Sequence, residues 1–196
     1  MRDERDEQAP ESMESQHDAP GSTWRTVGTR EVYRNPWLEV VEYAVVRPDG
    51  QPGIYGVVNP GDNASIVALD AEGGLYLVGD FCYPLQRYQW TIPTGRVEDG
   101  EAPEVAARRE LAEEAGIMAA RWELLGAFDL TPGICTQTSF IYLARDLTLG
   151  EPRPEGTEQF TLRRLPLADA YAACLSGELR NAVSVLGILR TSLLLG

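Results

Sequence analysis

The segment over residues 95–117 constrains the chain most, because it predicts one sharply delimited helix with acidic residues along one side. Pro103 takes a first-turn position, where its missing N–H breaks no helical hydrogen bond. Gly116 ends the helix, since glycine adopts the backbone shape of a C-terminal cap without strain. We therefore expect a helix over residues 103–115 with a loop on each side.

Three glutamates share one face of this helix, since helical positions three and four apart lie beside one another. They are Glu110, Glu113 and Glu114. Neighbouring carboxylates repel one another unless positive charge lies among them. Arg109 reaches Glu113 but cannot neutralise the whole group, whereas Mg²⁺ is bound by such carboxylates together with substrate phosphate oxygens. The cluster indicates a divalent cation, although an exposed charged helix face would have the same composition.

The spacing of these residues resembles the signature of the Nudix hydrolase family, G-x5-E-x7-R-E-U-x-E-E-x-G-U, in which U is a bulky aliphatic residue. Every specified position is filled, by Gly95, Glu101, Arg109, Glu110, Leu111, Glu113, Glu114, Gly116 and Ile117. The resemblance implies a Nudix fold of mixed α/β (α+β) class, with a mixed β-sheet sandwiched between helices. It also implies hydrolysis of a nucleoside diphosphate linked to another moiety.

The same resemblance assigns the metal ligands. Glu110 and Glu114 would be the main ligands, and Glu113 would support them. In a related subgroup, the backbone carbonyl just before the first glycine of the signature (the Nudix box) also binds metal. In this sequence that carbonyl belongs to Thr94. The implied cofactor is Mg²⁺ or, alternatively, Mn²⁺, which neutralises the pyrophosphate and lowers the pKa of a water.

Two further catalytic roles follow from the resemblance. Arg109 would orient the carboxylate of Glu101. A glutamate on a late loop would assist the attacking water, and Glu158 is the first candidate for it, with Glu155 the second. A merely solvated loop charge is the competing interpretation of this position.

The substrate inference comes from residues outside the box, which resemble the ADP-ribose pyrophosphatase subgroup. These are residues 90–95, residues 177–182 and Pro132, which lies 16 residues beyond Gly116. Trp37 and Tyr88 are aromatic candidates for stacking on a base, although a core or interface role is the alternative for both. We expect Trp37, Tyr88 and Pro132 to bind substrate, and ADP-ribose to be cleaved to AMP and ribose 5-phosphate.

Three positions depart from that subgroup, namely Cys82, Thr91 and Gln137. They affect expected substrate contacts and leave the metal cluster intact. Another nucleotide sugar, or a dinucleotide such as NADH or a diadenosine polyphosphate, is therefore an alternative substrate. A non-catalytic nucleotide sensor is the alternative from a different class of protein.

Charge and residue usage exclude several other chemistries. The formal net charge of −13 has the wrong sign for tracking a phosphate backbone, so nucleic acid is not an expected partner. All 17 basic residues are arginines, which excludes a Schiff-base or Walker-type lysine. The single histidine, His17, lies in the acidic N-terminal stretch, so a Ser-His-Asp or Cys-His site has no base. The three cysteines form no CxxC pair, which argues against a zinc site or a disulfide framework. We expect reduced thiols that serve packing.

The chain is expected to have three parts. Residues 1–22 are acidic and nearly devoid of apolar side chains, which predicts a disordered tail. Residues 23–60 predict N-terminal strands with a hairpin around residues 47–50, and in the resembling enzymes such strands pair two subunits into a homodimer. Residues 61–196 would form the hydrolase domain. No membrane segment or signal peptide is indicated, so we expect a cytoplasmic protein.

Overall fold

The structure is a computed structural model that describes residues 21–152 and 160–196. The chain divides into two compact units between Val58 and Asn59. Each unit is considered by itself below. The expected acidic tail over residues 1–22 lies outside the described residues apart from its last two, and so does His17.

The first unit is a three-stranded sheet in the order β1–β2–β3. Its strands are β1 (Arg25–Arg34), β2 (Glu39–Val46) and β3 (Pro52–Asn59), with β1 antiparallel to β2. The expected hairpin turn is confirmed, since Gly50 donates its N–H to the Arg47 carbonyl at 2.9 Å. Strand β1 is an addition to the predicted hairpin, because its three arginines and its irregular polarity hide the strand pattern.

The second unit contains a mixed sheet in the order β10–β5–β4–β9–β8, with β6 beside β5 and β7 beside β4. Strand β4 runs parallel to β9, and the other strand pairs with an established register are antiparallel. The strands are β4 (Asn63–Leu69), β5 (Gly74–Cys82), β6 (Arg87–Thr91), β7 (Thr94–Arg96), β8 (Ile117–Asp129), β9 (Thr138–Leu149) and β10 (Thr161–Pro166).

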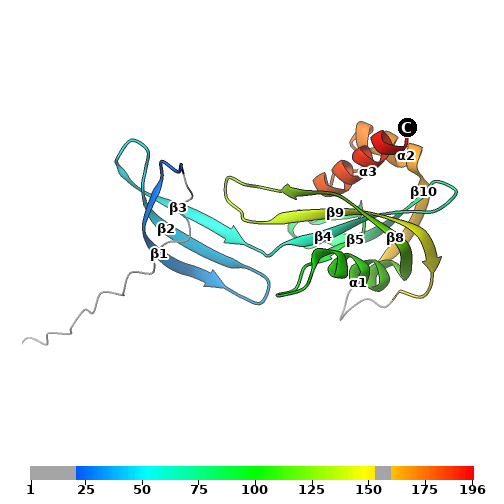
Figure 1. The fold of residues 1–196 in the computed structure, drawn as a ribbon, viewed down its shortest axis with the longest axis horizontal. Coiled ribbons are helices and arrows are strands. Elements are labelled where there is room, and N and C mark those ends of the chain that lie inside the picture. The colour runs from blue at the N-terminus through cyan, green and yellow to red at the C-terminus, as the bar shows by residue number, and fades with distance from the viewer. Residues whose placement is uncertain (1–20, 153–159) are drawn as a thin grey trace, which may run out of the picture. The chain divides into compact units, whose positions relative to one another are not determined.

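Helices cover both faces of this sheet, as the sequence predicts. They are α1 (Pro103–Ala115), α2 (Leu167–Ser176) and α3 (Ala182–Leu195), with a short 3₁₀ turn, η1 (Tyr83–Leu85), before β6. Figure 1 shows α1 on one side of the sheet and α2 with α3 on the other. In the part of the chain that the structure describes, no helix is both long and apolar enough to cross a membrane.

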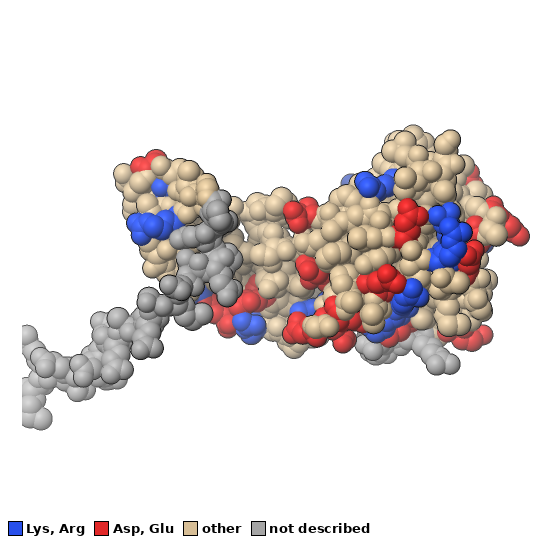
Figure 2. All heavy atoms as spheres, viewed as in Figure 1, with Lys and Arg blue, Asp and Glu red and all other residues tan. Residues whose placement is uncertain are grey.

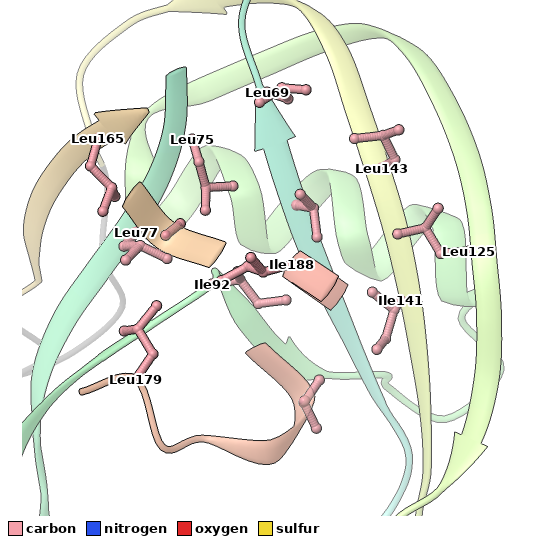
Figure 3. Close-up of a cluster of buried hydrophobic side chains, with 13 residues drawn as sticks. Leu69, Leu75, Leu77, Ile92, Leu125, Ile141, Leu143, Leu165, Leu179 and Ile188 are labelled. Atoms are coloured by element: carbon pink, nitrogen blue, oxygen red, sulfur yellow. The ribbon is translucent and has the colours of Figure 1, made fainter. Parts of the chain in front are cut away.

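The alternation of side chains along β4 divides the core into two layers. Ala64, Ile66 and Ala68 pack in the layer that contains α1, while Val67 and Leu69 pack in the layer that contains α2 and α3. Figure 3 shows the second layer, in which Leu75, Leu77, Ile92, Ile141 and Ile188 converge from different elements. Each fully buried side chain of this size contributes about 1.5–3 kcal/mol, so this layer holds α2 and α3 firmly on the sheet.

The cysteines behave as packing residues. All three are free thiols, and each is partly buried. Cys174 of α2 packs against the core, and burial raises the pKa of its thiol above the ordinary value. A thiol with a raised pKa is a poor nucleophile at neutral pH, which fits a structural role.

Candidate active site

Helix α1 is the scaffold of the candidate site. Its N-terminus begins with the expected proline, and Gly116 caps the C-terminus in the left-handed region at φ 65°. A Cβ there would lie 2.5 Å from the Pro152 nitrogen, so only glycine fits this stop. Ala106, Ala107 and Leu111 bury one side of α1 in the core. Because this buried side fixes the helix in place, the acidic residues on its other sides are fixed as well.

Arg109 is the centre of the charge network. Its guanidinium donates two hydrogen bonds to Glu101, at 3.2 and 3.0 Å, and one to the Arg96 carbonyl at 2.9 Å. Nη1 also donates to Glu110 at 2.6 Å and to Glu113 at 3.2 Å. These bonds, first of all those with Glu101, raise the pKa of Arg109 and hold the pKa of the Glu101 carboxyl below its usual range. Both groups stay charged at neutral pH.

Glu114 occupies a different environment from the other two helical glutamates. It is only 8% exposed, and its Oε2 accepts a hydrogen bond from the backbone N–H of Thr94 at 3.0 Å. A charged hydrogen bond of this kind stabilises a buried carboxylate. The strand end that carries Thr94 and the helix that carries Glu114 are therefore joined directly.

Gly95 allows the closest approach between that strand end and α1. A Cβ at this position would lie 1.8 Å from Cδ of Glu110, well inside any real contact distance. A side chain at this first glycine of the signature would displace the Glu110 carboxylate, so glycine keeps that carboxylate in its place.

The donors along α1 fit a hard divalent cation in their chemistry. Glu110, Glu113 and Glu114 offer carboxylate oxygens from one helix, and such oxygens are the ligands that Mg²⁺ and Mn²⁺ prefer. Within residues 21–152 and 160–196, no three His, Cys, Asp or Glu side chains are grouped closely enough to hold a metal ion. The positive charge beside Glu110 and Glu113 is the Arg109 guanidinium.

Figure 2 shows how charge is distributed over the second unit. On the face in view, acidic and arginine side chains gather where α1 lies, and the surface over α2 and α3 is mostly uncharged. Arg108 adds to the charged side, since it pairs with Glu104 at 2.7 Å and lies 4.8 Å from the centre of the Trp122 ring. The helix thus has an outer exposed ion pair and an inner, partly buried network.

The predicted substrate residues lie on separate elements. Tyr88 of β6 packs edge-on against Trp90, with ring centres 5.7 Å apart, and its hydroxyl lies over Gly79 of β5. Pro132 is exposed in the loop between β8 and β9. Trp37 lies in the first unit, in the turn between β1 and β2, and is 71% exposed. Their roles remain predictions, as do those of Glu155 and Glu158, which lie outside the described residues.

The structure also reveals polar residues that the sequence interpretation did not select. Ser65 of β4 and Ser139 of β9 are fully buried, and Ser65 lies 2.9 Å from the Thr94 hydroxyl. The available signal was weak, because it consists of one hydroxyl within an otherwise apolar strand. Gln137, one of the departing positions, donates from its side chain to the Gly61 carbonyl at 3.0 Å.

Comparison with known proteins identifies the class. The NUDIX domain matches residues 59–186, and the nucleoside diphosphate sugar hydrolase N-terminal domain matches residues 24–58. The first match covers well over half of the chain, so the chain belongs to the NUDIX family, and the resemblance drawn from the box is confirmed.

Two curated relatives and one solved structure are similar to this chain. An ADP-ribose pyrophosphatase of Mycobacterium tuberculosis is 34% identical over 128 residues, which is 64% of this chain and 62% of that relative. An ADP-ribose pyrophosphatase of Bacillus subtilis is 28% identical over 166 residues, 84% of this chain and 90% of the relative. A crystal structure of an ADP compounds hydrolase superposes with a TM-score of 0.79 and covers 89% of this chain and 95% of that one, at 21% identity. This last similarity confirms the fold alone.

Proposed function

We propose that this chain is a metal-dependent hydrolase that cleaves the pyrophosphate bond of ADP-ribose, giving AMP and ribose 5-phosphate. The observation that carries the proposal is the charged network of α1 and the loop before it, in which Arg109 binds Glu101, Glu110 and Glu113 together. The names of the two pyrophosphatase relatives support the choice of substrate.

Glu110, Glu114 and the Thr94 carbonyl would hold the cofactor, with Glu113 supporting them. Mg²⁺ is the proposed ion, with Mn²⁺ as the alternative. When bound, the ion supplies charge that neutralises the pyrophosphate and lowers the pKa of a water.

The protein's own residues prepare this site. The Arg109 guanidinium fixes Glu101 through two parallel bonds, so that the loop before α1 keeps one position relative to the helix. Thr94 fixes the Glu114 carboxylate through its N–H. A late-loop glutamate, Glu158 or secondly Glu155, is proposed to accept a proton from the attacking water.

Substrate recognition is proposed to involve Pro132, Tyr88 and Trp37. The exposed surfaces of Pro132 and Trp37 leave room for contact with a nucleotide. Aromatic rings stack on bases regardless of the identity of the base, so Tyr88 and Trp37 would contribute affinity more than selectivity.

We also propose that the first unit forms a homodimer and that the protein is cytoplasmic. Within one chain, only Val45 of the described part of this unit is buried. One face of its sheet has an apolar hollow of about 270 Å³, lined by Trp24, Thr26, Tyr43, Val45, Tyr55 and Val57. A three-stranded sheet needs a covered apolar face to be stable, and a second copy would supply it.

The test is product formation from ADP-ribose, NADH, diadenosine polyphosphates, GDP-mannose and UDP-glucose, with and without Mg²⁺. Metal-dependent release of AMP and ribose 5-phosphate, with the highest kcat/KM for ADP-ribose, is the expected result. A higher kcat/KM for another compound would replace the proposed substrate and direct attention to Cys82, Thr91 and Gln137. If the chain binds these nucleotides but hydrolyses none of them, the sensor alternative is correct.

A further inference from the structure

Three hydroxyl groups from three different strands form a continuous line beside the candidate metal site. The Oγ atoms of Ser139 on β9 and Ser65 on β4 lie 3.4 Å apart, and Ser65 Oγ lies 2.9 Å from Oγ1 of Thr94 on β7. Both serines have no exposed surface. Buried hydroxyls are costly without partners, so each member of this line keeps the others satisfied.

The line ends on the backbone turn that precedes the box. Oγ1 of Thr94 also lies 3.0 Å from the Ile92 carbonyl, which can only accept. The Thr94 hydroxyl is the donor toward both Ser65 Oγ and the Ile92 carbonyl, so its single proton is shared between these two acceptors. In the Ser65–Ser139 pair either hydroxyl can donate. The Thr94 hydroxyl therefore joins the turn to the hydroxyls of the sheet interior.

Other bonds hold the same turn from the remaining sides. The Ile92 N–H donates to Ser184 Oγ of α3 at 3.0 Å, and the Pro93 carbonyl accepts from the Ile66 N–H at 2.9 Å. The Thr94 N–H donates to Glu114 at 3.0 Å. The threonine hydroxyl is therefore the side-chain part of a network whose far end is the Glu114 carboxylate.

We propose that Thr94, Ser65 and Ser139 are positioning residues, whose hydroxyl chain holds the Ile92–Thr94 turn so that Glu114 is oriented for divalent-cation binding. The proposal rests on the proposed function in so far as Glu114 is a metal ligand. It adds a role for three side chains that the box signature does not specify.

The test measures binding of Mn²⁺ alone, by electron paramagnetic resonance of the free ion, in Thr94→Val, Thr94→Ser and Ser65→Ala. Loss of about one net hydrogen bond predicts roughly fivefold weaker Mn²⁺ binding in Thr94→Val, with near wild-type binding restored in Thr94→Ser. Ser65→Ala should weaken binding by about twofold to fivefold. In the combined Ser65→Ala and Thr94→Val variant, the fold-loss of Mn²⁺ affinity should be smaller than the product of the two single losses, because the two hydroxyls belong to one hydrogen-bonded line.

Thr191→Val is the matched control. Thr191 is also fully buried in the second unit, but its Oγ1 has no hydrogen-bond partner among the residues that the structure describes. Removing this hydroxyl should leave Mn²⁺ affinity unchanged. The free-energy change of unfolding, measured without metal, separates positioning from a general loss of stability.

Unchanged Mn²⁺ affinity in both Thr94→Val and Ser65→Ala would overturn the proposal, as would equal weakening in Thr94→Ser and Thr94→Val. If Thr94→Val does not fold, Ser139→Ala tests the other end of the line of three hydroxyls. About twofold weaker Mn²⁺ binding is expected, and wild-type binding would contradict the proposal. A different result separates the two proposals. If the variants change Mn²⁺ affinity as expected but the wild-type protein does not hydrolyse ADP-ribose, the proposed function is refuted and this inference stands.

Discussion

The two units are both built on strands, but they differ in how many apolar side chains they bury. The described part of the first unit buries one side chain, Val45, and leaves Trp37 and Ile54 about 70% exposed. The second unit covers its sheet on both faces and buries two apolar layers. Both units contain strands with apolar residues, so strand formation alone does not determine which unit has a core of its own.

The difference shows what the helices contribute. Helix α1 covers one face of the second sheet and carries the charged network on its remaining surface, so packing and chemistry share one element. The first unit has no helix in its described part, and its ion pairs, such as Arg30 with Glu42, lie at the surface. We therefore expect substitutions in the second unit to change catalysis and stability. Substitutions in the first unit, apart from the proposed substrate residue Trp37, should change association.

Glu114→Gln should produce the largest effect. The substitution keeps an oxygen that can accept from the Thr94 N–H, so the fold should persist, but it removes the charge that binds the cation. A fall in kcat/KM of at least about a hundredfold is expected, with a matching loss of Mg²⁺ affinity. Glu110→Gln should behave similarly.

Glu104→Gln is the control on the same helix, because Glu104 belongs to the exposed pair with Arg108. Its kcat/KM should stay within about twofold of the wild-type value. Full activity in Glu114→Gln would show that the metal site is misplaced.

Arg109→Ala is expected to cost about 2–3 kcal/mol in the free energy of unfolding without metal, since several charged hydrogen bonds of a partly buried network are lost at once. Saturating Mg²⁺ should recover part of the loss, because a cation that binds the native state stabilises it. Thermal unfolding with and without Mg²⁺ measures both quantities.

The neighbouring Arg108→Ala sharpens this result. Arg108 and Glu104 are both nearly half exposed, so their pair should contribute less than about 1 kcal/mol. Equal losses for Arg108→Ala and Arg109→Ala would mean that α1 has no distinct inner network.

The α1 region was predictable because its information is local. The proline and glycine at its ends determine a helix of defined length, and the spacing of its glutamates places them along one side. The hairpin turn at residues 47–50 was predictable for the same reason. Strand β1 and the short strands β6 and β7 were not predictable. Strand β1 is polar, β6 and β7 have five and three residues, and β7 pairs with β4, which lies elsewhere in the sequence.

The site was predictable only in part. The sequence indicated that Arg109 reaches Glu101 and Glu113, but not that the same guanidinium also binds Glu110 and the Arg96 carbonyl. The hydroxyl chain was missed because Ser65 and Ser139 are 74 residues apart and meet only through the parallel pairing of β4 and β9. Sequence spacing carries no information about such contacts.

Tyr55→Arg tests the proposed role of the first unit. Tyr55 lines the apolar hollow and packs against Trp24 with ring centres 5.7 Å apart. A charge there should convert the dimer to a monomer, as measured by analytical ultracentrifugation, because desolvating an unpaired guanidinium at an interface is unfavourable. Ile54→Arg places the same charge on the opposite side of β3, since successive residues of a strand alternate.

Ile54→Arg should remain dimeric, and Mn²⁺ affinity should be the same in both variants. Dissociation of Ile54→Arg but not Tyr55→Arg would transfer the interface to the other face of the sheet. A monomeric wild-type protein would remove the homodimer altogether.

The smallest effect concerns pH and again contrasts the two units. In the second unit, the bonds from Arg109 hold the pKa of the Glu101 carboxyl below its value in the unfolded chain. Its contribution to stability is therefore fully present above the unfolded pKa of about 4.3 and is lost as the pH falls through the lower folded pKa. Glu101→Gln should lower the free energy of unfolding by about 1 kcal/mol at pH 7, and this deficit should shrink below about pH 4.

Glu42→Gln provides the comparison from the first unit. Glu42 pairs there with Arg30, whose side chain is 69% exposed. Exposed pairs are screened by water, so this variant should match the wild type at every pH within about 0.5 kcal/mol. Urea unfolding of the three proteins between pH 3 and pH 7 measures the two curves. A pH-independent deficit in Glu101→Gln would mean that this residue stabilises the loop before α1 by packing, and that its charge and the Arg109 network contribute nothing there.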